Sequence, residues 1–308
     1  MINDRLIDAG ELPIAIRDFG GDHPPLLLLH GAGANLAHLT GLARALRPHH
    51  RVITLDLRGH GRSGDGAWTW DAGLGDLAAV TVQMELDRPP AVVGHSFGGM
   101  LATLWGQRHP ESPGVVNLDG NPPPTRPGQL PGLDPEKATA ELARLTATFD
   151  AMQAAIGHTF PTADLPDLVE RQRAAARDAG ANEKIWIEGF RRNVVSKDGK
   201  TTVRPDPATT ATMRTLMNDI DLGPVYTTTP TPTLTVLATR NMPAQEPFAD
   251  LYAAHRRHLL DEAEAAAKAN PRLHYFSLEN ATHAMPLEQP DFLASLISDF
   301  LRGATRGA

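Results

Sequence analysis

Cysteine is absent from the 308 residues of this chain. Its absence excludes disulfide bonds, thiolate nucleophiles and cysteine-ligated metal sites. Aromatic residues make up only 5% of the sequence, and no apolar run approaches the roughly 20 residues that a membrane-spanning helix needs. The first ten residues are polar and lack the apolar centre of a signal peptide. We therefore expect a cytoplasmic protein that does not bind a membrane.

A surplus of positive charge is also missing. The formal net charge is -7 at pH 7 and no long basic run occurs, which argues against nucleic acid as a partner. No metal-ligating motif and no G-x-G-x-x-G nucleotide loop is present in the sequence. We therefore expect neither a metal nor an organic cofactor. The sequence leaves the oligomeric state open, a homodimer included.

The chain has the composition of an α/β protein and the alternation of strand-like and helical segments that is typical of one. Apolar residues make up 41% and charged residues 21%, as in a globular protein with a large core. Short β-type runs alternate with helical segments, which predicts a mostly parallel sheet covered by helices on both faces. The expected strands are 12–19, 26–29, 52–57, 91–94, 115–119, 233–238 and 273–278.

The alternation of strand-like and helical segments stops after residue 120. The proline-rich stretch 121–135 cannot continue a central strand. Helical patterns follow, with no convincing buried strand before residue 220. The expected helices there are 138–156, 165–179, 183–194 and 209–218. The sequence thus predicts a core domain of residues 1–120 and 226–308, interrupted by a helical cap insertion, residues 121–225.

The segment 89–100, PPAVVGHSFGGM, carries the strongest chemical signal. An apolar run ends in Gly-x-Ser-x-Gly, and a helix-forming segment follows at once, which is the context that a nucleophile elbow requires. Glycine at positions 94 and 98 removes side chains that would collide in so sharp a turn. We expect Ser96 to project above the sheet edge as a nucleophile, with the N–H of Phe97 at the start of the following helix.

Four segments, in this order, resemble the α/β-hydrolase family. They are 26–33 (LLLLHGAG), 56–63 (DLRGHGRS), the elbow, and 280–290 (NATHAMPLEQP). The first looks like the strand and loop that supply the family's oxyanion hole, and the last like the loop that carries its catalytic histidine. The resemblance covers essentially the whole sheet domain. It implies the α/β-hydrolase fold and hydrolysis through a serine nucleophile.

The resemblance assigns a base and an oxyanion hole. A serine hydroxyl is a poor nucleophile at neutral pH and needs a base, for which His283 is the candidate. Its unperturbed pKa of about 6.5 suits proton transfer near pH 7. The backbone N–H groups of Ala32 and Phe97 are the expected donors to the oxyanion, each contributing about 3 kcal/mol. His30 is expected to brace the oxyanion loop through hydrogen bonds.

The acid of the triad is where the sequence departs from the common pattern. In most family members it follows the strand after the insertion, but here that segment, 237–243, reads LATRNMP and has no carboxylate. Glu246 and Asp250 come later, displaced toward a helix. Asp119 ends an earlier strand, a position where some family members carry the acid. We expect Asp119 to complete the triad, with Glu246 and Asp250 as alternatives. If it does not, Asp119 is a turn residue without a catalytic role.

A serine nucleophile excludes the aspartate-dependent epoxide hydrolases and haloalkane dehalogenases of the family. Ester, lactone or amide hydrolysis remains. The cap is rich in apolar side chains, and ligand sites are mostly apolar. We expect some of these side chains to line the pocket and to favour a medium-sized, largely apolar ester or lactone. The expected pocket residues are Trp186, Phe190, Met152 and Met213.

Two other functions stay open. A C–C bond hydrolase acting on a β-diketone or a ring-cleavage product resembles this architecture and uses the same triad. Its substrate carboxylate would need a cation, for which Arg191, Arg192 and Arg214 of the cap are candidates, although surface positions are the simpler interpretation. The second is a ligand-binding protein of receptor type, in which the same fold binds its ligand and hydrolyses it only slowly.

Overall fold

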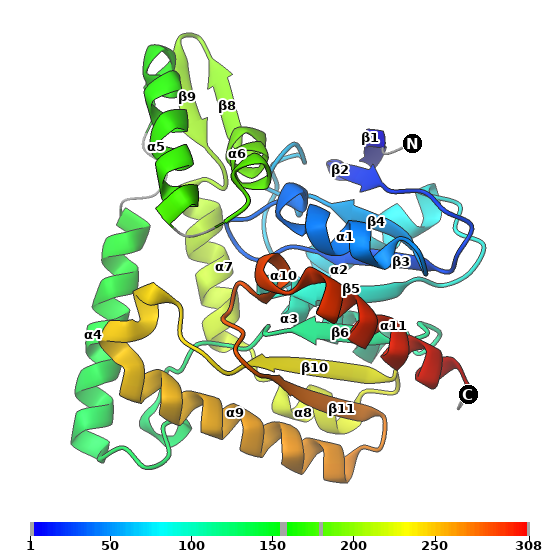
Figure 1. Cartoon of the computed structure of the whole chain (residues 1–308), viewed down its shortest axis with the longest axis vertical. Helices are drawn as coiled ribbons and strands as arrows, with labels where there is room; N and C mark the ends of the chain where they lie inside the picture. The colour runs from blue at the N-terminus through cyan, green and yellow to red at the C-terminus, as the bar shows by residue number, and fades with distance from the viewer. Residues whose placement is uncertain (1–2, 155–158, 179–180, 307–308) are drawn as a thin grey trace.

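An eight-stranded sheet forms the centre of the molecule (Figure 1). The computed structural model describes residues 3–154, 159–178 and 181–306. The strand order is β1-β2-β4-β3-β5-β6-β10-β11. The strands are β1 Asn3–Asp8, β2 Pro13–Asp18, β3 Pro25–Leu29, β4 Arg51–Leu55, β5 Ala91–His95, β6 Val115–Leu118, β10 Thr233–Ala238 and β11 Leu273–Leu278. Within this sheet only the pairings β1–β2 and β2–β4 are antiparallel, so the predicted fold class is confirmed.

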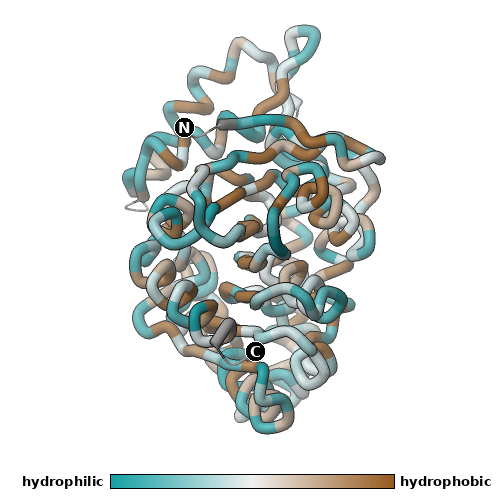
Figure 2. Tube along the Cα trace, turned by 90° about the vertical axis from the view of Figure 1, so that its right-hand side faces the viewer, coloured by the Kyte–Doolittle hydropathy of each residue, from teal (hydrophilic) through white to brown (hydrophobic). Residues whose placement is uncertain are grey.

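The central strands are apolar because both of their faces are covered. All of Leu26 to Leu29 in β3 are fully buried. Side chains alternate across a sheet, so Leu26 and Leu28 join one apolar cluster and Leu27 and Leu29 join another. Figure 2 shows the same distribution along the chain, with apolar residues gathered on the inner strands and hydrophilic residues on the outer coils.

Helices cover the two faces of this sheet. Helices α1 and α11 pack against each other and contribute to the cluster of Leu26 and Leu28, whereas α2 and α3 contribute to the cluster of Leu27 and Leu29. None of the described helices is long and apolar enough to cross a bilayer. The helical segments of the core are η1 Leu36–Leu39, α1 Thr40–Leu46, α2 Trp70–Gln83, α3 Phe97–Arg108, α8 Gly223–Thr228, η4 Pro243–Phe248, α9 Ala249–Ala269, α10 Met285–Glu288 and α11 Pro290–Arg306.

The insertion between β6 and β10 carries the expected helices with shifted ends. Residues 155, 156 and 179 of the predicted helices lie outside the described residues. Helix α4 packs against the start of α9 of the core, where apolar side chains of both helices form one cluster, and Figure 1 shows α9 running away from α4 beyond this contact. The helical segments are η2 Pro127–Gln129, α4 Pro135–Ala154, η3 Thr162–Asp164, α5 Leu165–Asp178, α6 Glu183–Arg192 and α7 Pro207–Asp219.

The expectation of a purely helical insertion was wrong, because a small second sheet lies within it. Its three strands, in the order β7-β9-β8, are Phe160–Pro161, Lys200–Val203 and Val194–Lys197. Asp198 and Gly199 form the two-residue turn of the β8–β9 hairpin, both with positive φ (51° and 72°). Asp-Gly between β-type runs is a strong hairpin signal. The strands were not predicted because they are largely exposed and therefore lack the continuous apolar run of a buried strand.

Candidate active site

The three residues expected to form a triad lie at one edge of the large sheet. Ser96 directly follows β5, Asp119 directly follows β6, and His283 lies between β11 and α10. The carboxyl ends of neighbouring parallel strands lie at a common edge, where α/β proteins place their ligands. The sheet order therefore brings together residues that are 164 positions apart in the chain.

Ser96 occupies a strained turn that the surrounding glycines make possible. Its backbone has φ 55° and ψ -122°, a region that serine rarely adopts. A Cβ atom on Gly94 would lie 1.9 Å from the carbonyl oxygen of Gly98, so no other residue fits there. The Ser96 N–H donates to the Leu118 carbonyl at 3.0 Å, which ties the turn to β6. Ser96 is also the N-cap of α3, where the first N–H groups lack partners within the helix.

The loop after β3 passes directly over this serine. A Cβ atom on Gly31 would lie 2.9 Å from Ser96 Cβ and 3.3 Å from Ser96 Oγ. The next residue is Ala32, whose N–H is one of the two expected oxyanion donors. The other donor, the N–H of Phe97, belongs to the first turn of α3. The two expected donors thus come from segments that flank the hydroxyl.

His283 and Asp119 form the central hydrogen bond of the site, with Nδ1 and Oδ2 2.7 Å apart. Burial alone would lower the pKa of His283, but the hydrogen bond to Asp119 and its negative charge outweigh burial and raise that pKa. Burial alone would raise the pKa of Asp119, but His283 and the Ala238 N–H, which donates to Oδ1 at 3.0 Å, hold it below its usual value. With Nδ1–H donating to a carboxylate, neutral His283 keeps an unprotonated Nε2.

The residue before the serine, His95, supports the position of His283. Burial lowers the pKa of His95 to about 3, and the nearby His283 adds to this effect. His95 is therefore neutral, and its Nε2–H donates to the backbone carbonyl of His283 at 2.7 Å. The two rings lie 4.8 Å apart between centroids. The turn thus carries the candidate nucleophile and also anchors the backbone of the candidate base.

Two buried histidines fix the loop after β3, the candidate oxyanion loop, to the loop after β4. His30 Nδ1–H donates to the Gly31 carbonyl at 2.8 Å, and His30 Nε2 accepts from the Leu57 N–H at 3.0 Å. His60 Nε2 accepts from the Gly33 N–H at 3.3 Å. Burial lowers the pKa of both rings, that of His60 to about 4, so both stay neutral and can accept as well as donate. The bracing contacts expected for His30 are present.

Asn193, at the end of α6 in the cap, holds the same loop from above, and the sequence analysis missed it. Its Oδ1 accepts from the Gly61 N–H and from Asn35 Nδ2, both at 3.0 Å, and its Nδ2 donates to the Gly33 carbonyl at 3.2 Å. We call this set of bonds the Asn193 clasp. No local pattern marks it, because all three partners lie more than 130 residues away in the chain.

Arg192, the neighbour of Asn193, is also not the surface residue that the simpler interpretation expected. It is 6% exposed. Its Nε donates to Asp56 Oδ2 and its Nη1 to Asp4 Oδ2, both at 2.8 Å. Asp56, fully buried, also accepts from the Leu36 and Arg62 N–H groups. Cap and core are therefore joined by a buried ion pair beside the clasp.

An apolar cavity of about 180 Å³ lies between cap and core and reaches the oxyanion loop. Met152 and Met213, two of the expected pocket residues, line it. Trp186 and Phe190 do not. Trp186 instead donates from Nε1 to Gln172 Oε1 of α5 at 2.9 Å. The complete lining is Ala32, Gly33, Pro123, Phe149, Met152, Gln153, Pro205, Thr210, Met213, Arg214, Met217 and Asn218.

The alternative acids lie elsewhere. Glu246 is exposed on η4. Asp250 pairs with Lys137 on the surface at 2.8 Å. Neither makes a hydrogen bond or ion pair with His283 in the described part of the chain. Arg214, one of the candidate carboxylate-binding residues, borders the apolar cavity but already pairs with Asp150 at 2.6 Å.

Comparison with known proteins agrees with this geometry. Residues 26–296 match the alpha/beta hydrolase family, and the chain belongs to that family. It is 34% identical over 108 residues to the sn-1-specific diacylglycerol lipase ABHD11 of Xenopus laevis, covering 34% of each chain. It is 31% identical over 126 residues to a pimeloyl-[acyl-carrier protein] methyl ester esterase of Yersinia enterocolitica, covering 40% of this chain and 47% of the relative. The chain thus spans less than half of either relative.

Solved structures share the fold over nearly the whole chain. E-2-(acetamidomethylene)succinate hydrolase superposes with a TM-score of 0.73 at 20% identity, covering 98% of this chain and 100% of that one. The enol-lactonase from Burkholderia xenovorans LB400 superposes with a TM-score of 0.62 at 21% identity, covering 97% of this chain and 100% of that one. These likenesses show that the chain has the α/β-hydrolase fold.

Proposed function

We propose that this protein is a serine hydrolase that cleaves a medium-sized, largely apolar carboxylic ester or lactone through an acyl-enzyme. The observation that carries the proposal is the 2.7 Å hydrogen bond between His283 and Asp119 at the sheet edge that holds Ser96. Beside it, the oxyanion loop borders an apolar cavity. The names of the relatives support the chemistry, since they include a lipase, a methyl ester esterase and an enol-lactonase.

The reaction follows from the protonation states of these groups. Ser96 Oγ attacks the substrate carbonyl carbon while His283 Nε2 takes the hydroxyl proton. The carbonyl oxygen becomes negative and accepts from the N–H groups of Ala32 and Phe97. His283 then gives its proton to the leaving alkoxide, and the acyl-enzyme remains. His283 then takes a proton from water, which attacks the acyl carbon; as the acid leaves, His283 returns the proton to Ser96 Oγ and the free enzyme is restored.

The cavity sets an upper limit on the group that is fully enclosed. A dry cavity of about 150 Å³ holds one benzene molecule, and this cavity has about 180 Å³. It therefore suits a single ring or a short acyl chain, and any larger part of the substrate must extend toward solvent. Met152, which borders the cavity and is 55% exposed, lies at this opening.

Active-site labelling tests the proposal. A fluorophosphonate probe should add one adduct to the wild-type protein, mapped by mass spectrometry to the peptide that contains Ser96. Ser96→Ala should remove the adduct and the hydrolysis of p-nitrophenyl butyrate together, with the circular dichroism spectrum unchanged. An adduct on another residue, or full hydrolysis by Ser96→Ala, would overturn the proposal. Binding of esters without turnover would favour the receptor-type alternative.

The C–C bond hydrolase remains the second candidate. The contact that favours it is Arg214 at the rim of the cavity, a cation that could meet a substrate carboxylate. Its pairing with Asp150 weakens this argument, because the carboxylate would have to displace an existing partner. Parallel assays with simple esters, lactones and a β-diketone acid, each with and without Arg214→Gln, separate the two. Turnover of the β-diketone acid alone, lost in Arg214→Gln, would favour the second candidate.

A further inference from the structure

A second and larger cavity lies away from the candidate active site, on the outer side of α6. Its volume is about 620 Å³, and it shares no lining residue with the apolar cavity. Strand β2, the loop after β4, and helices α5 and α6 all contribute to it. The lining is almost entirely charged and comprises Arg17, Arg62, Arg173, Glu183, Lys184, Ile187, Glu188, Arg191 and Arg192.

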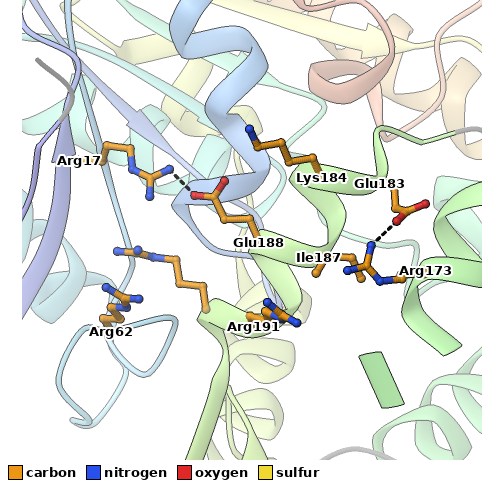
Figure 3. A pocket seen from close by; sticks show the side chains of 9 residues that line it. Arg17, Arg62, Arg173, Glu183, Lys184, Ile187, Glu188 and Arg191 are labelled. Atoms are coloured by element: carbon orange, nitrogen blue, oxygen red, sulfur yellow. Dashed lines mark hydrogen bonds and ion pairs between the residues drawn. The ribbon is translucent and has the colours of Figure 1, made fainter. Parts of the chain in front are cut away.

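The two carboxylates of this cavity are already neutralised. Glu188 pairs with Arg17 at 2.6 Å, and Glu183 pairs with Arg173. Figure 3 shows these pairs at two sides of the cavity, with the Arg62 side chain on the same side as Arg17 and that of Arg191 nearer the centre. The side chains of Arg62, Arg191 and Lys184 make no ion pair or hydrogen bond with any described residue. Three cations thus share one concave surface without a counter-charge.

The buried wall of the cavity carries an unsatisfied donor. Arg192 is 6% exposed and uses Nε and Nη1 on Asp56 and Asp4, but its Nη2 is buried without any hydrogen-bond partner. A buried guanidinium nitrogen without an acceptor is costly, and such groups normally find one. An anionic oxygen entering the cavity would supply a counter-charge for the three cations, and it would reach Nη2, which has almost no exposed surface, only after the Arg192 side chain shifts. A water molecule would supply no counter-charge.

We propose that this cavity binds a phosphate-bearing small molecule. Guanidinium groups present N–H donors in a planar fork that matches phosphate oxygens, and five of the nine lining residues are arginines. The volume lies within the roughly 300–1,000 Å³ of small-molecule sites, which is more than one phosphate needs. A pyrophosphate group, or a phosphate ester with a polar tail, therefore fits better than a single inorganic phosphate. Nothing in this proposal depends on which bond Ser96 attacks.

Calorimetric titration of the full chain with pyrophosphate, in 150 mM sodium chloride, tests this site. We expect one molecule to bind per chain. The variant Arg62→Gln/Arg191→Gln should weaken binding at least about tenfold, because it removes two charge-assisted contacts. Lys184→Gln serves as a second variant on the same wall. Arg272→Gln is the matched control, since Arg272 is exposed at the start of β11.

The comparison of ligands separates specific binding from simple charge attraction. Pyrophosphate and an organic diphosphate ester should compete for the same site. Chloride, added to give the same concentration of negative charge, should displace neither of them. If only the ester binds, the site recognises the organic part of the ligand. If both bind equally, the site recognises the diphosphate group itself. Absence of binding, or equal affinity in wild type and the double variant, would overturn the proposal. Circular dichroism of each variant confirms that the fold is retained.

Discussion

At the scale of single residues, the unusual feature of the site is the origin of the candidate acid. Asp119 comes from the end of β6, although β10 lies between β6 and the strand before His283. Its N–H donates to the Val236 carbonyl at 2.8 Å, and its carboxylate accepts from the Ala238 N–H. Both contacts are to β10, so Asp119 spans the end of that strand to reach His283. A positive φ of 52° at Asp119 allows this path.

Replacing Asp119 by asparagine tests its role as the acid. The change keeps the size of the side chain but removes its charge and permits the wrong tautomer of His283. In a serine protease the equivalent change costs about four orders of magnitude in turnover, and we expect kcat to fall at least about 100-fold here. Glu246→Gln is the control, because Glu246 is exposed, and should lose less than about tenfold. The opposite ranking would remove Asp119 from the triad.

The pH dependence gives a second test of the same pair. Asp119 raises the pKa of His283, and protonated His283 cannot act as a base. Activity should therefore fall as the pH drops through a value above about 6.5, the ordinary pKa of histidine. In Asp119→Asn the raising influence is gone, so the acidic limb of the kcat/KM profile should move to lower pH. A limb at the same pH in both proteins would show that another group controls it.

These residues differ in how far the sequence could predict them. The nucleophile segment is local, since strand, turn and helix follow within twelve residues, so its geometry is readable from the sequence. Asp119 could be proposed only because the later position lacks a carboxylate. Arg192 and Asn193 could not be assigned, because their partners lie far away in the chain and nothing near them marks burial. Long-range polar contacts depend on how cap and core dock, which no local pattern encodes.

At the scale of elements, α6 connects the cap to the candidate oxyanion loop. Its last turn carries Arg192, and its C-cap is Asn193. At the opposite end of the helix, Asn182 caps the first turn by accepting from the Ile185 N–H at 3.2 Å. One helix thus has an asparagine at each end, and only the second of them contacts the loop that holds Ala32. This arrangement offers a matched pair of variants.

Asn193→Ala should reduce kcat by roughly 10- to 100-fold, because loss of the Asn193 clasp frees the Gly33 carbonyl and shifts the neighbouring N–H of Ala32, and small misplacements cost up to about 100-fold. Asn182→Ala removes a helix cap worth about 1 kcal/mol but leaves the loop contacts intact. It should lower Tm with little change in kcat. The measurement is kcat and Tm for both variants. Equal losses of kcat would mean that the clasp only stabilises the cap.

The β8–β9 hairpin shows why the cap was less predictable than the core. Core strands are buried on both faces, and their continuous apolar runs are distinctive. The hairpin strands are short and exposed, and Val194 to Lys197 read equally well as the end of a helix. The turn Asp198-Gly199 was the only local evidence for strands. Element type is thus predictable where burial imposes a pattern and poorly predictable where it does not.

At the scale of the whole molecule, the apolar cavity exists only because the cap covers the sheet edge. Ala32 and Gly33 of the core form one side, and residues of α4 and α7 form the other. In the proposed function the core would supply the reacting groups, and the cap would supply most of the surface that contacts the acyl or ring portion of the substrate. Changes in the cap should alter preference more than reactivity.

Met152→Trp should narrow the cavity from its exposed side. We expect kcat/KM for p-nitrophenyl octanoate to fall at least about tenfold, with p-nitrophenyl acetate changed less than about twofold, because only the longer chain needs the space. Trp186→Ala is the control, since Trp186 lies outside the cavity lining, and should leave the ratio of the two substrates unchanged. A uniform loss on both substrates in Met152→Trp would indicate a disturbed fold rather than a blocked cavity.

The position of Asp119 also affects which parts of the chain can change during evolution or engineering. In the proposed triad the acid lies before the cap, so the segment 239–247 after β10 has no duty in catalysis. It connects β10 to α9 and includes most of η4, and its Thr239 and Arg240 N–H groups donate to the Ala281 carbonyl in the loop before His283. Insertions, affinity tags or a new pair of chain termini should therefore be tolerated at its exposed residues 243 and 244, with activity retained. In relatives that carry their acid after this strand, the same segment would be closed to such changes.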